Sequence, residues 1–309
     1  MIKYYKTNDV LEELDHIEKG TWIHMLDPEP EEIKYITEYF DLDDSFIPDA
    51  LDEEESARID CEDGNVLILV NMPTVQAEGN TFVYETVPLG IILTKENIIT
   101  VCLEESSVIE DFFRKRVRSF DTCKRTRFLL QLLFKNAQKF LQYLRQIEKS
   151  STQVEDALHK NMKNKDLIKL LKIEKSLVYF STALKANEIV LEKMLKSSSI
   201  KYYPDDTDLL EDVIIENKQA IEMCTIYRDI VQGTTEAFAS VISNNLNVVM
   251  RFLTVMTIVI AVPTFITSLW GINVPVPFEH NSMGFWIIIG ISVVCTIITV
   301  IWLWRKKML

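Results

Sequence analysis

Residues 252–270 read FLTVMTIVIAVPTFITSLW, and residues 284–304 read GFWIIIGISVVCTIITVIWLW. Neither stretch contains a charged residue, and each has about the 20 apolar residues that a helix needs to cross the core of a bilayer. The alternative is a pair of helices buried in a soluble core. Such helices normally keep a polar face, which the second stretch lacks almost completely. The two stretches therefore predict two transmembrane helices.

Basic residues flank the two stretches at their outer ends along the chain and are missing from the connection between them. Arg251 precedes the first stretch, and Arg305, Lys306 and Lys307 follow the second, whereas the connection at residues 271–283 has no lysine or arginine. By the positive-inside rule, both termini lie in the cytoplasm and the connection lies outside. The N-terminus has no apolar run, so we expect no cleaved secretory signal. This pattern predicts a multi-pass protein of the cell (inner or plasma) membrane.

Nearly all the charge lies before the first stretch. The chain of 309 residues has 33 Lys and Arg against 46 Asp and Glu, and only four of the basic and one of the acidic residues follow position 249. Residues 1–250 therefore hold 29 basic and 45 acidic residues, a net charge of −16. So acidic a domain disfavours nucleic acid and favours cations as partners, although solubility is the commoner reason for acidity.

Motifs of enzymes and of structural metal sites are missing from the sequence. The five cysteines form no CxxC pair, and the four histidines show no zinc-ligand spacing. Nothing resembles a P-loop, a catalytic triad or a metal-hydrolase site. We therefore expect a protein that is not an enzyme and that needs no organic cofactor.

The chain before the membrane changes character along its length. β-Branched runs separated by turn residues predict strands of one sheet at residues 66–72, 82–87, 90–94 and 98–103, with a turn at 95–97. Further on, Gly and Pro almost vanish and leucine recurs at helical spacing. We expect a cytoplasmic α/β domain at residues 1–105, a cytoplasmic helical hairpin at 106–207, and a stalk helix continuing into the first transmembrane helix at 208–270. An outer loop at 271–283, the second transmembrane helix at 284–304 and a basic tail at 305–309 follow.

The stalk prediction rests on the lack of helix breakers. Pro204 lies in a linker and is expected to stop any helix crossing it. From Asp208 to Pro263 no proline interrupts the helical pattern. One helix on the order of 90 Å long would therefore run from the cytoplasm through the membrane. The fold class is thus a membrane protein with an α+β cytoplasmic domain, a long helical stalk and two transmembrane helices.

A seam of mostly small or hydroxyl-bearing residues follows one face of the first span at intervals of three and four residues. Its members are Asn247, Met250, Thr254, Thr257, Ala261, Thr264 and Ser268. One interpretation is a packing seam of the kind that membrane helices use. The other is the water-contacting wall of a pore. Because two spans cannot enclose a channel, a pore requires a homo-oligomer.

The segment Trp270-Gly271-Ile272-Asn273 ends the first span and opens the outer loop. This position resembles the CorA magnesium transporter family, whose mark is Gly-Met-Asn at the same place, so that Ile272 stands for the methionine. The likeness extends to further segments: Leu253-Thr254, Thr264-Phe265-Ile266, Tyr227 to Val231 with Gly233, the basic end, and the hairpin sequence PLGIILTKENIITV at residues 88–101.

The resemblance implies a funnel-shaped homopentamer with a central pore lined by the first span. It implies an inner constriction, a pore-wall threonine, an outer selectivity ring, and a regulatory metal site between subunits. By position, the inner constriction corresponds to Asn247, Met250 and Leu253, the pore-wall threonine to Thr264, and the selectivity ring to Gly271 and Asn273. The regulatory metal site corresponds to Asp49, in the acidic segment DLDDSFIPDALDEEE at residues 41–55, together with Asp212 of the neighbouring subunit.

The function that we expect is divalent cation uptake in a membrane. Mg²⁺ is the first candidate, both as transported ion and as cytoplasmic regulator, and Co²⁺ and Ni²⁺ are further candidates. Two charges moving down the membrane potential gain ~4.6 kcal/mol per 100 mV, so no nucleotide is needed. Two alternatives stay open. One is a zinc-type transporter of the same superfamily, and the other is a membrane-anchored helical scaffold that conducts nothing.

Cysteine labelling tests the predicted orientation. A cysteine that replaces Asn281 is expected to react with a membrane-impermeant thiol reagent added to intact cells, because the connection has no basic residue to hold it inside. A cysteine that replaces Lys307 is expected to react only after the membrane is permeabilised. The unsubstituted chain gives the background from its five own cysteines. The reverse labelling pattern would overturn the topology.

Overall fold

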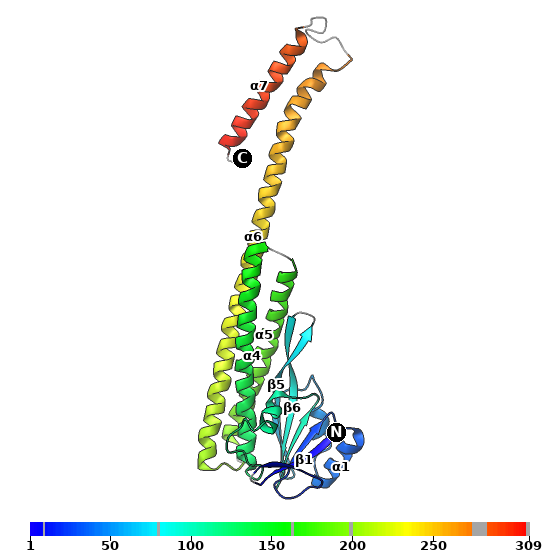
Figure 1. The fold of residues 1–309 in the computed structure, drawn as a ribbon, viewed down its shortest axis with the longest axis vertical. Helices are drawn as coiled ribbons and strands as arrows, with labels where there is room; N and C mark the ends of the chain where they lie inside the picture. Colours follow the sequence, from blue (N-terminus) through cyan, green and yellow to red (C-terminus); the bar gives the residue numbers. More distant parts are fainter. Residues whose placement is uncertain (9, 79–80, 162–163, 198–199, 274–282, 307–309) are drawn as a thin grey trace. The chain divides into compact units, whose positions relative to one another are not determined.

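In the computed structural model, the described part of the chain is residues 1–309 without 9, 79–80, 162–163, 198–199, 274–282 and 307–309. The chain divides into two compact units, Met1–Thr235 and Glu236–Leu309. The elements, shown in Figure 1, are β1 (Ile2–Thr7), β2 (Leu11–Leu14), β3 (Trp22–Leu26), α1 (Pro30–Phe40), α2 (Phe46–Asp49), β4 (Arg58–Glu62), β5 (Asn65–Glu78), β6 (Thr81–Leu93), β7 (Ile98–Cys102), α3 (Ser107–Phe113), α4 (Arg125–Asn161), α5 (Asn164–Lys196), α6 (Pro204–Trp270) and α7 (Gly284–Arg305).

The first unit is built on one seven-stranded sheet with the order β2-β1-β3-β7-β6-β5-β4. All neighbouring strands are antiparallel except β3 and β7, which are parallel. The expected turn at 95–97 joins β6 to β7, where the Thr94 N–H donates to the Asn97 carbonyl. The expectation of separate strands at 82–87 and 90–94 is wrong, because β6 continues through Pro88 and Gly90 and pairs with β5 along its whole length.

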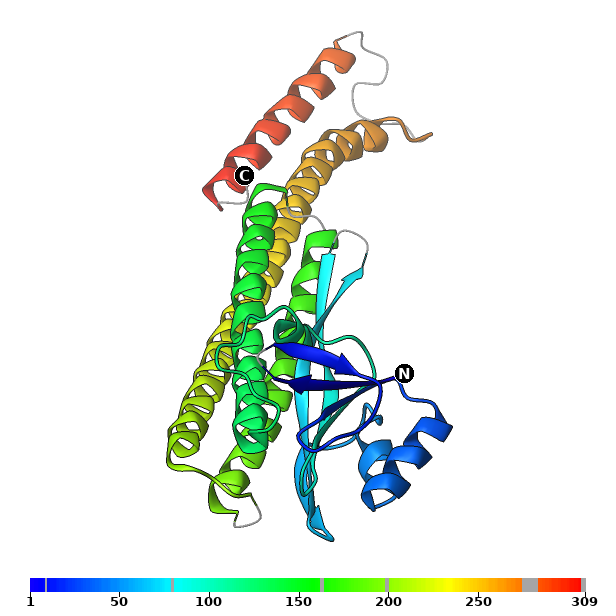
Figure 2. The same ribbon diagram turned by 60° about the horizontal axis from the view of Figure 1, so that its bottom comes forward.

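Both faces of this sheet are covered. Successive residues of a strand point to opposite faces, so Val66, Ile68 and Val70 pack in one core with α3, α4, α5 and the beginning of α6. Leu67 and Leu69 pack in a second core with residues of α1 and α2. The long helices α4 and α5 and the short helices α1 and α2 lie on different sides of the sheet in Figure 2. A strand buried on both faces explains why β5 reads as a continuous apolar run.

Two asparagines fasten the long helices to the sheet. Beyond Leu69, β5 has no further pairing with β4. There the backbone N–H of Asn71 donates to the side-chain oxygen of Asn187 in α5, over 2.8 Å. The Asn71 carbonyl accepts from the side-chain amides of Asn187 and of Asn136 in α4, each over 2.8 Å. Side-chain amides thus satisfy a strand backbone that would otherwise be buried without partners.

Helix α6 begins at Pro204, four residues before the expected start at Asp208. Among the described residues, no helix crosses Pro204, as expected. The proline opens α6, because its missing N–H and fixed φ suit the first helical position. Nearby, the carboxylate of Asp206 accepts from the backbone N–H of Tyr203 over 3.2 Å. The helix then continues through Pro263 to Trp270.

The second unit contains the two apolar helices. The C-terminal part of α6 and the whole of α7 are long and apolar enough to cross a membrane. Their large apolar side chains are exposed, with Phe252, Phe265 and Trp286 at 61%, 66% and 70%. A surface of this kind is suited to lipid or to other copies of the helix. The two predicted spans are confirmed as helices, while most of the predicted outer loop (274–282) and the end of the basic tail (307–309) lie outside the described residues.

Gly90 provides a test of how α2 reaches the sheet. A methyl group at this position would lie 2.3 Å from the Ala50 side chain and 3.4 Å from that of Val101. Gly90→Ala is therefore expected to destabilise the protein by about 1–3 kcal/mol through overpacking. The measurement is the melting temperature of the full-length protein in detergent, which should fall by several degrees.

Gly233→Ala is the matched control, because a methyl group on this α6 residue meets nothing within 4 Å. Replacing glycine inside a helix by alanine normally stabilises it by up to about 1 kcal/mol. Equal melting temperatures for the two variants would contradict the close packing of α2 on β6.

Candidate functional site

The predicted seam forms a shallow hollow along α6. Small side chains alternate there with larger ones and leave a groove of about 550 Å³, lined by Thr257, Ile260, Ala261, Thr264, Phe265 and Ser268. Four of the seven predicted seam residues therefore share one continuous concave surface. The hollow offers hydroxyl and backbone oxygens and no ionised side chain.

The seam hydroxyls bond to their own helix. Thr254, Thr257 and Thr264 each donate to the carbonyl four residues earlier, over 2.8 Å. In α7, Thr296 and Thr299 do the same, also over 2.8 Å. Local bonding therefore does not distinguish the two helices. What distinguishes α6 is the row of small residues, whose hydroxyl oxygens keep lone pairs that can accept from water.

The residues predicted at the inner constriction, Asn247, Met250 and Leu253, are exposed on α6. About half of the Met250 and Leu253 surfaces is accessible, at 55% and 54%. Large apolar side chains are rarely left open in this way. This exposed surface is therefore suited to lipid or to further copies of the chain.

At the outer end, Gly271, Ile272 and Asn273 directly follow α6, and all three are exposed. The Gly271 N–H closes the last turn by donating to the carbonyls of Thr267 and Ser268, over 3.0 and 3.2 Å. The C-terminus of a helix has a partial negative charge from its unpaired carbonyls, which favours a cation nearby. The predicted selectivity ring thus lies where helix and side-chain oxygens can both face a cation.

Asp49 at the end of α2 has a partner that the sequence did not reveal. Its carboxylate accepts from the Arg58 guanidinium over 2.6 Å, and the same guanidinium pairs with Glu55 and Asp60. These contacts raise the pKa of Arg58, chiefly through the hydrogen bond to Asp60. The Asp49 and Arg58 side chains are about a quarter exposed. A divalent ion at Asp49 would therefore meet a positive charge already in place.

Asp212 lies eight residues after the start of α6 and is exposed. A carboxylate near the start of a helix can instead serve to stabilise the helix N-terminus. That effect falls off within the first turn of a helix, so the start at Pro204 disfavours it. Within the described part of one chain, no interaction joins Asp212 to Asp49, and no group of three or more His, Cys, Asp or Glu side chains is placed to hold a metal ion.

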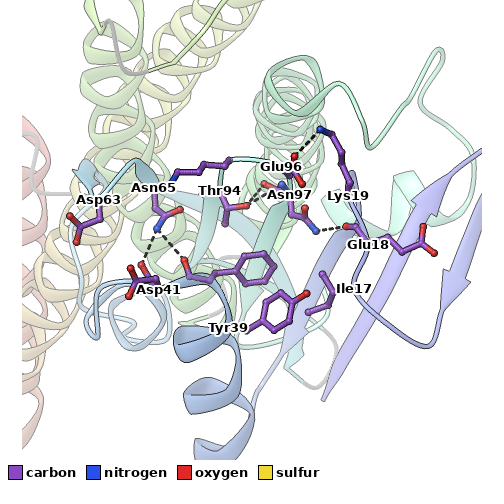
Figure 3. Close-up of a pocket in the computed structure, with 12 residues that line it drawn as sticks. Ile17, Glu18, Lys19, Tyr39, Asp41, Asp63, Asn65, Thr94, Glu96 and Asn97 are labelled. Carbon is purple, nitrogen blue, oxygen red and sulfur yellow. Dashed lines mark hydrogen bonds and ion pairs between the residues drawn. The ribbon is translucent and has the colours of Figure 1, made fainter.

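A polar hollow of about 460 Å³ lies at one end of the sheet, beside the β4–β5 and β6–β7 turns. Figure 3 shows its bonds: Asn65 donates to the carbonyls of Phe40 and Asp41, Asn97 donates to that of Glu18, and Lys19 pairs with Glu96. These contacts join the end of α1 to the turns of the sheet. The hollow contains none of the predicted site residues. Its two buried amides, Asn65 and Asn97, donate to backbone carbonyls of neighbouring segments, which is the pattern of a structural junction.

The comparisons with known proteins agree on one family. A family model described as CorA-like Mg2+ transporter protein matches residues 18–307. The "Cobalt/magnesium transport protein CorA" of Methanocaldococcus jannaschii is 26% identical over 293 residues, which covers 90% of this chain and 88% of the relative. The protein of the same name from Thermotoga maritima is 25% identical over 321 residues, which covers 99% and 88%.

A solved structure supports the same fold. The complete structure of the CorA magnesium transporter from Methanocaldococcus jannaschii aligns with a TM-score of 0.85 at 24% identity, over 99% of this chain and 98% of the other. The likeness covers the sheet, the long helices and both membrane helices. Since the family model spans almost the whole length as well, the chain belongs to the CorA-like Mg²⁺ transporter protein family.

Proposed function

We propose that this protein is a divalent cation channel that takes up Mg²⁺, with Co²⁺ and Ni²⁺ as further substrates. The observation that carries the proposal is the neutral seam of α6, which ends in Gly271, Ile272 and Asn273 at the helix C-terminus. The relatives from Methanocaldococcus jannaschii and Thermotoga maritima are cobalt/magnesium transport proteins. We infer the same class of cargo for this chain.

Neutral oxygens suit this cargo. Mg²⁺ prefers oxygen ligands and gives up its water reluctantly. A ring of Asn273 amide oxygens and Gly271 carbonyls can hold the hydrated ion without a carboxylate, and binds it weakly enough to release it. Such a ring needs several copies around one axis. We propose a homopentamer in the cell membrane, with both termini in the cytoplasm and the ring outside.

Cytoplasmic Mg²⁺ regulates the channel in this proposal. Residues 1–250 of each copy have a net charge of −16, so neighbouring copies repel one another. A divalent ion shared by Asp49 of one subunit and Asp212 of the next reduces that repulsion and favours the closed arrangement. When the ion leaves, the interface loosens and α6 opens near Met250 and Leu253. The ion acts only through its better affinity for the closed state.

Arg58 sets the strength of this regulation. Its guanidinium holds the Asp49 carboxylate at 2.6 Å, and a cation that approaches Asp49 must share or displace it. Removing the guanidinium leaves three carboxylates without their common partner, namely Asp49, Glu55 and Asp60. The affinity for a divalent ion then rises.

Asn273→Ala tests the selectivity ring. The variant is expected to lose at least nine-tenths of its divalent cation uptake, because it removes the side-chain amide at the end of α6, while the oligomer stays assembled. The measurement is uptake into liposomes, with Mg²⁺, Co²⁺, Ni²⁺ and Zn²⁺ in competition. Normal uptake by an assembled variant would show that Asn273 does not lie in the ion path. A preference of the unsubstituted protein for Zn²⁺ would show that Zn²⁺ and not Mg²⁺ is the transported ion.

A matched pair of threonines serves as the control for the pore wall. Thr264 in the seam and Thr296 in α7 make the same bond to the carbonyl four residues earlier, over 2.8 Å in each. Thr264→Val is expected to reduce uptake, and Thr296→Val is expected to leave it unchanged. If both variants behaved alike, the seam would be a packing surface.

Two sets of substitutions test regulation in opposite directions. Asp49→Ala with Asp212→Ala is expected to raise the internal Mg²⁺ concentration needed for half inhibition by about tenfold or more. Arg58→Gln is expected to lower it, because the competing charge is gone. Patch recordings at several internal Mg²⁺ concentrations measure both. Selectivity should stay the same in each, and unchanged inhibition curves for both would exclude this pair as the main sensor.

A further inference from the structure

A third hollow of about 380 Å³, here named the basic cavity, lies where α4 begins and the chain turns from α5 into α6. Its lining residues are Cys123, Lys124, Arg125, Thr126, Arg127, Lys201, Tyr203 and Asp206. All of them belong to the first unit. The two sides of the cavity are tied together, since the Thr126 hydroxyl donates to the Lys201 carbonyl over 3.0 Å. None of these residues takes part in the proposed ion path or its regulation.

The cavity concentrates positive charge in a domain that is otherwise strongly acidic. Four of its lining residues are cationic and one is a carboxylate, whereas residues 1–250 have a net charge of −16. The carboxylate, Asp206, is buried and lies 3.8 Å from Arg127. Like charges gathered at one concave surface repel one another unless an anion joins them. The surplus of three positive charges is therefore a feature that the domain's overall composition does not explain.

Three of the cations have no carboxylate in contact within the described part of the chain. The Arg125 guanidinium donates to the Thr94 carbonyl, and burial lowers its pKa. Glu96 lies near enough to act on Arg125 but pairs with Lys19 over 2.7 Å. The Lys201 ammonium sits 5.7 Å above the Tyr203 ring, and Lys124 is exposed. All three have donors left for a ligand.

The backbone adds donors of the same kind. The first bond of α4 runs from the Phe128 N–H to the Lys124 carbonyl. The N–H groups of Arg125, Thr126 and Arg127 therefore precede the helical ladder, and no bond to any of them occurs among the described residues. Free N–H groups and the helix dipole both favour an anion at such an end.

We propose that this cavity binds a soluble polyphosphate group, either inorganic or as the phosphate tail of a nucleotide. Four cationic side chains match a ligand with several negative charges, because each phosphate accepts from ammonium and guanidinium donors. The cavity lies within the range of small-molecule sites. Tyr203 is 60% exposed and its ring lies beside Lys201, so it is placed to cover a base when the ligand is a nucleotide.

Cysteine labelling reads out this site directly. Cys123 lines the cavity and is exposed, and Cys61 is exposed outside the cavity. Sodium tripolyphosphate is expected to slow the reaction of Cys123 with N-ethylmaleimide at least fivefold and to leave Cys61 unchanged. The full-length protein in detergent is labelled in the presence of EDTA, so that no metal ion mediates the binding, and mass spectrometry of the peptides quantifies each site.

Lysine variants test which charges bind. Lys124→Ala with Lys201→Ala is expected to abolish the protection, and Lys124→Arg with Lys201→Arg is expected to keep it. Lys193→Ala with Lys218→Ala removes the same charge from exposed lysines of α5 and α6 and should have no effect. Each variant is used only if its size-exclusion profile matches that of the unsubstituted protein.

The possible results separate the proposal from its rivals. Protection of Cys123 by ATP as well as by tripolyphosphate, with the ATP effect partly lost in Tyr203→Ala, would indicate that the ligand is a nucleotide. No protection by millimolar tripolyphosphate, or equal protection in the alanine variant, overturns the proposal. So does protection by vesicles with anionic phospholipid but not by tripolyphosphate. None of these assays measures cation uptake, so their results test the anion site independently of the proposed transport function.

Discussion

The constraint on which this protein depends is the lack of water in the bilayer core, where each backbone N–H and C=O must find a partner inside the protein. Helices α6 and α7 meet it with their own hydrogen bonds, and the threonine hydroxyls of both helices bond back to their own turns. Polar groups can then lie on a helix face without an unsatisfied donor. What the seam offers outward is therefore acceptor oxygen, which suits the donating water molecules around a hydrated cation better than it suits an anion.

In the first unit, the same need for partners is met by side chains. Asn136 and Asn187 bond to the backbone of Asn71 from two different helices. The sheet is buried on both faces, so these bonds are made away from water and are specific in direction. They fix how α4 and α5 lie on β5. The position of Asp49 is set by the other face, where Ala50 packs against Gly90.

Hydropathy and charge were sufficient to predict the membrane helices, the acidic domain and the part of the sheet made by β5, β6 and β7, because these depend on patterns within single segments. The Pro88–Gly90 segment was misread as a break because strand pairing with β5 overrides local turn preference. The contacts of Arg58 could not be predicted, since three carboxylates from different positions meet it only in the folded chain. The basic cavity had a visible signal, the run Lys124-Arg125-Thr126-Arg127, but its closure by Lys201 and Tyr203 depends on a connection some 75 residues later.

The Arg58 guanidinium has one property that no dissolved ion shares. It is tethered to the site, so its effective concentration at Asp49 stays constant whatever the composition of the cytoplasm. In the proposed regulation, such an internal competitor fixes the concentration at which a divalent ion binds at Asp49, because the ion has to overcome the pairing energy of one arginine. Under the same proposal, a substitution of Arg58 changes the magnesium concentration to which the protein responds and leaves the pore untouched.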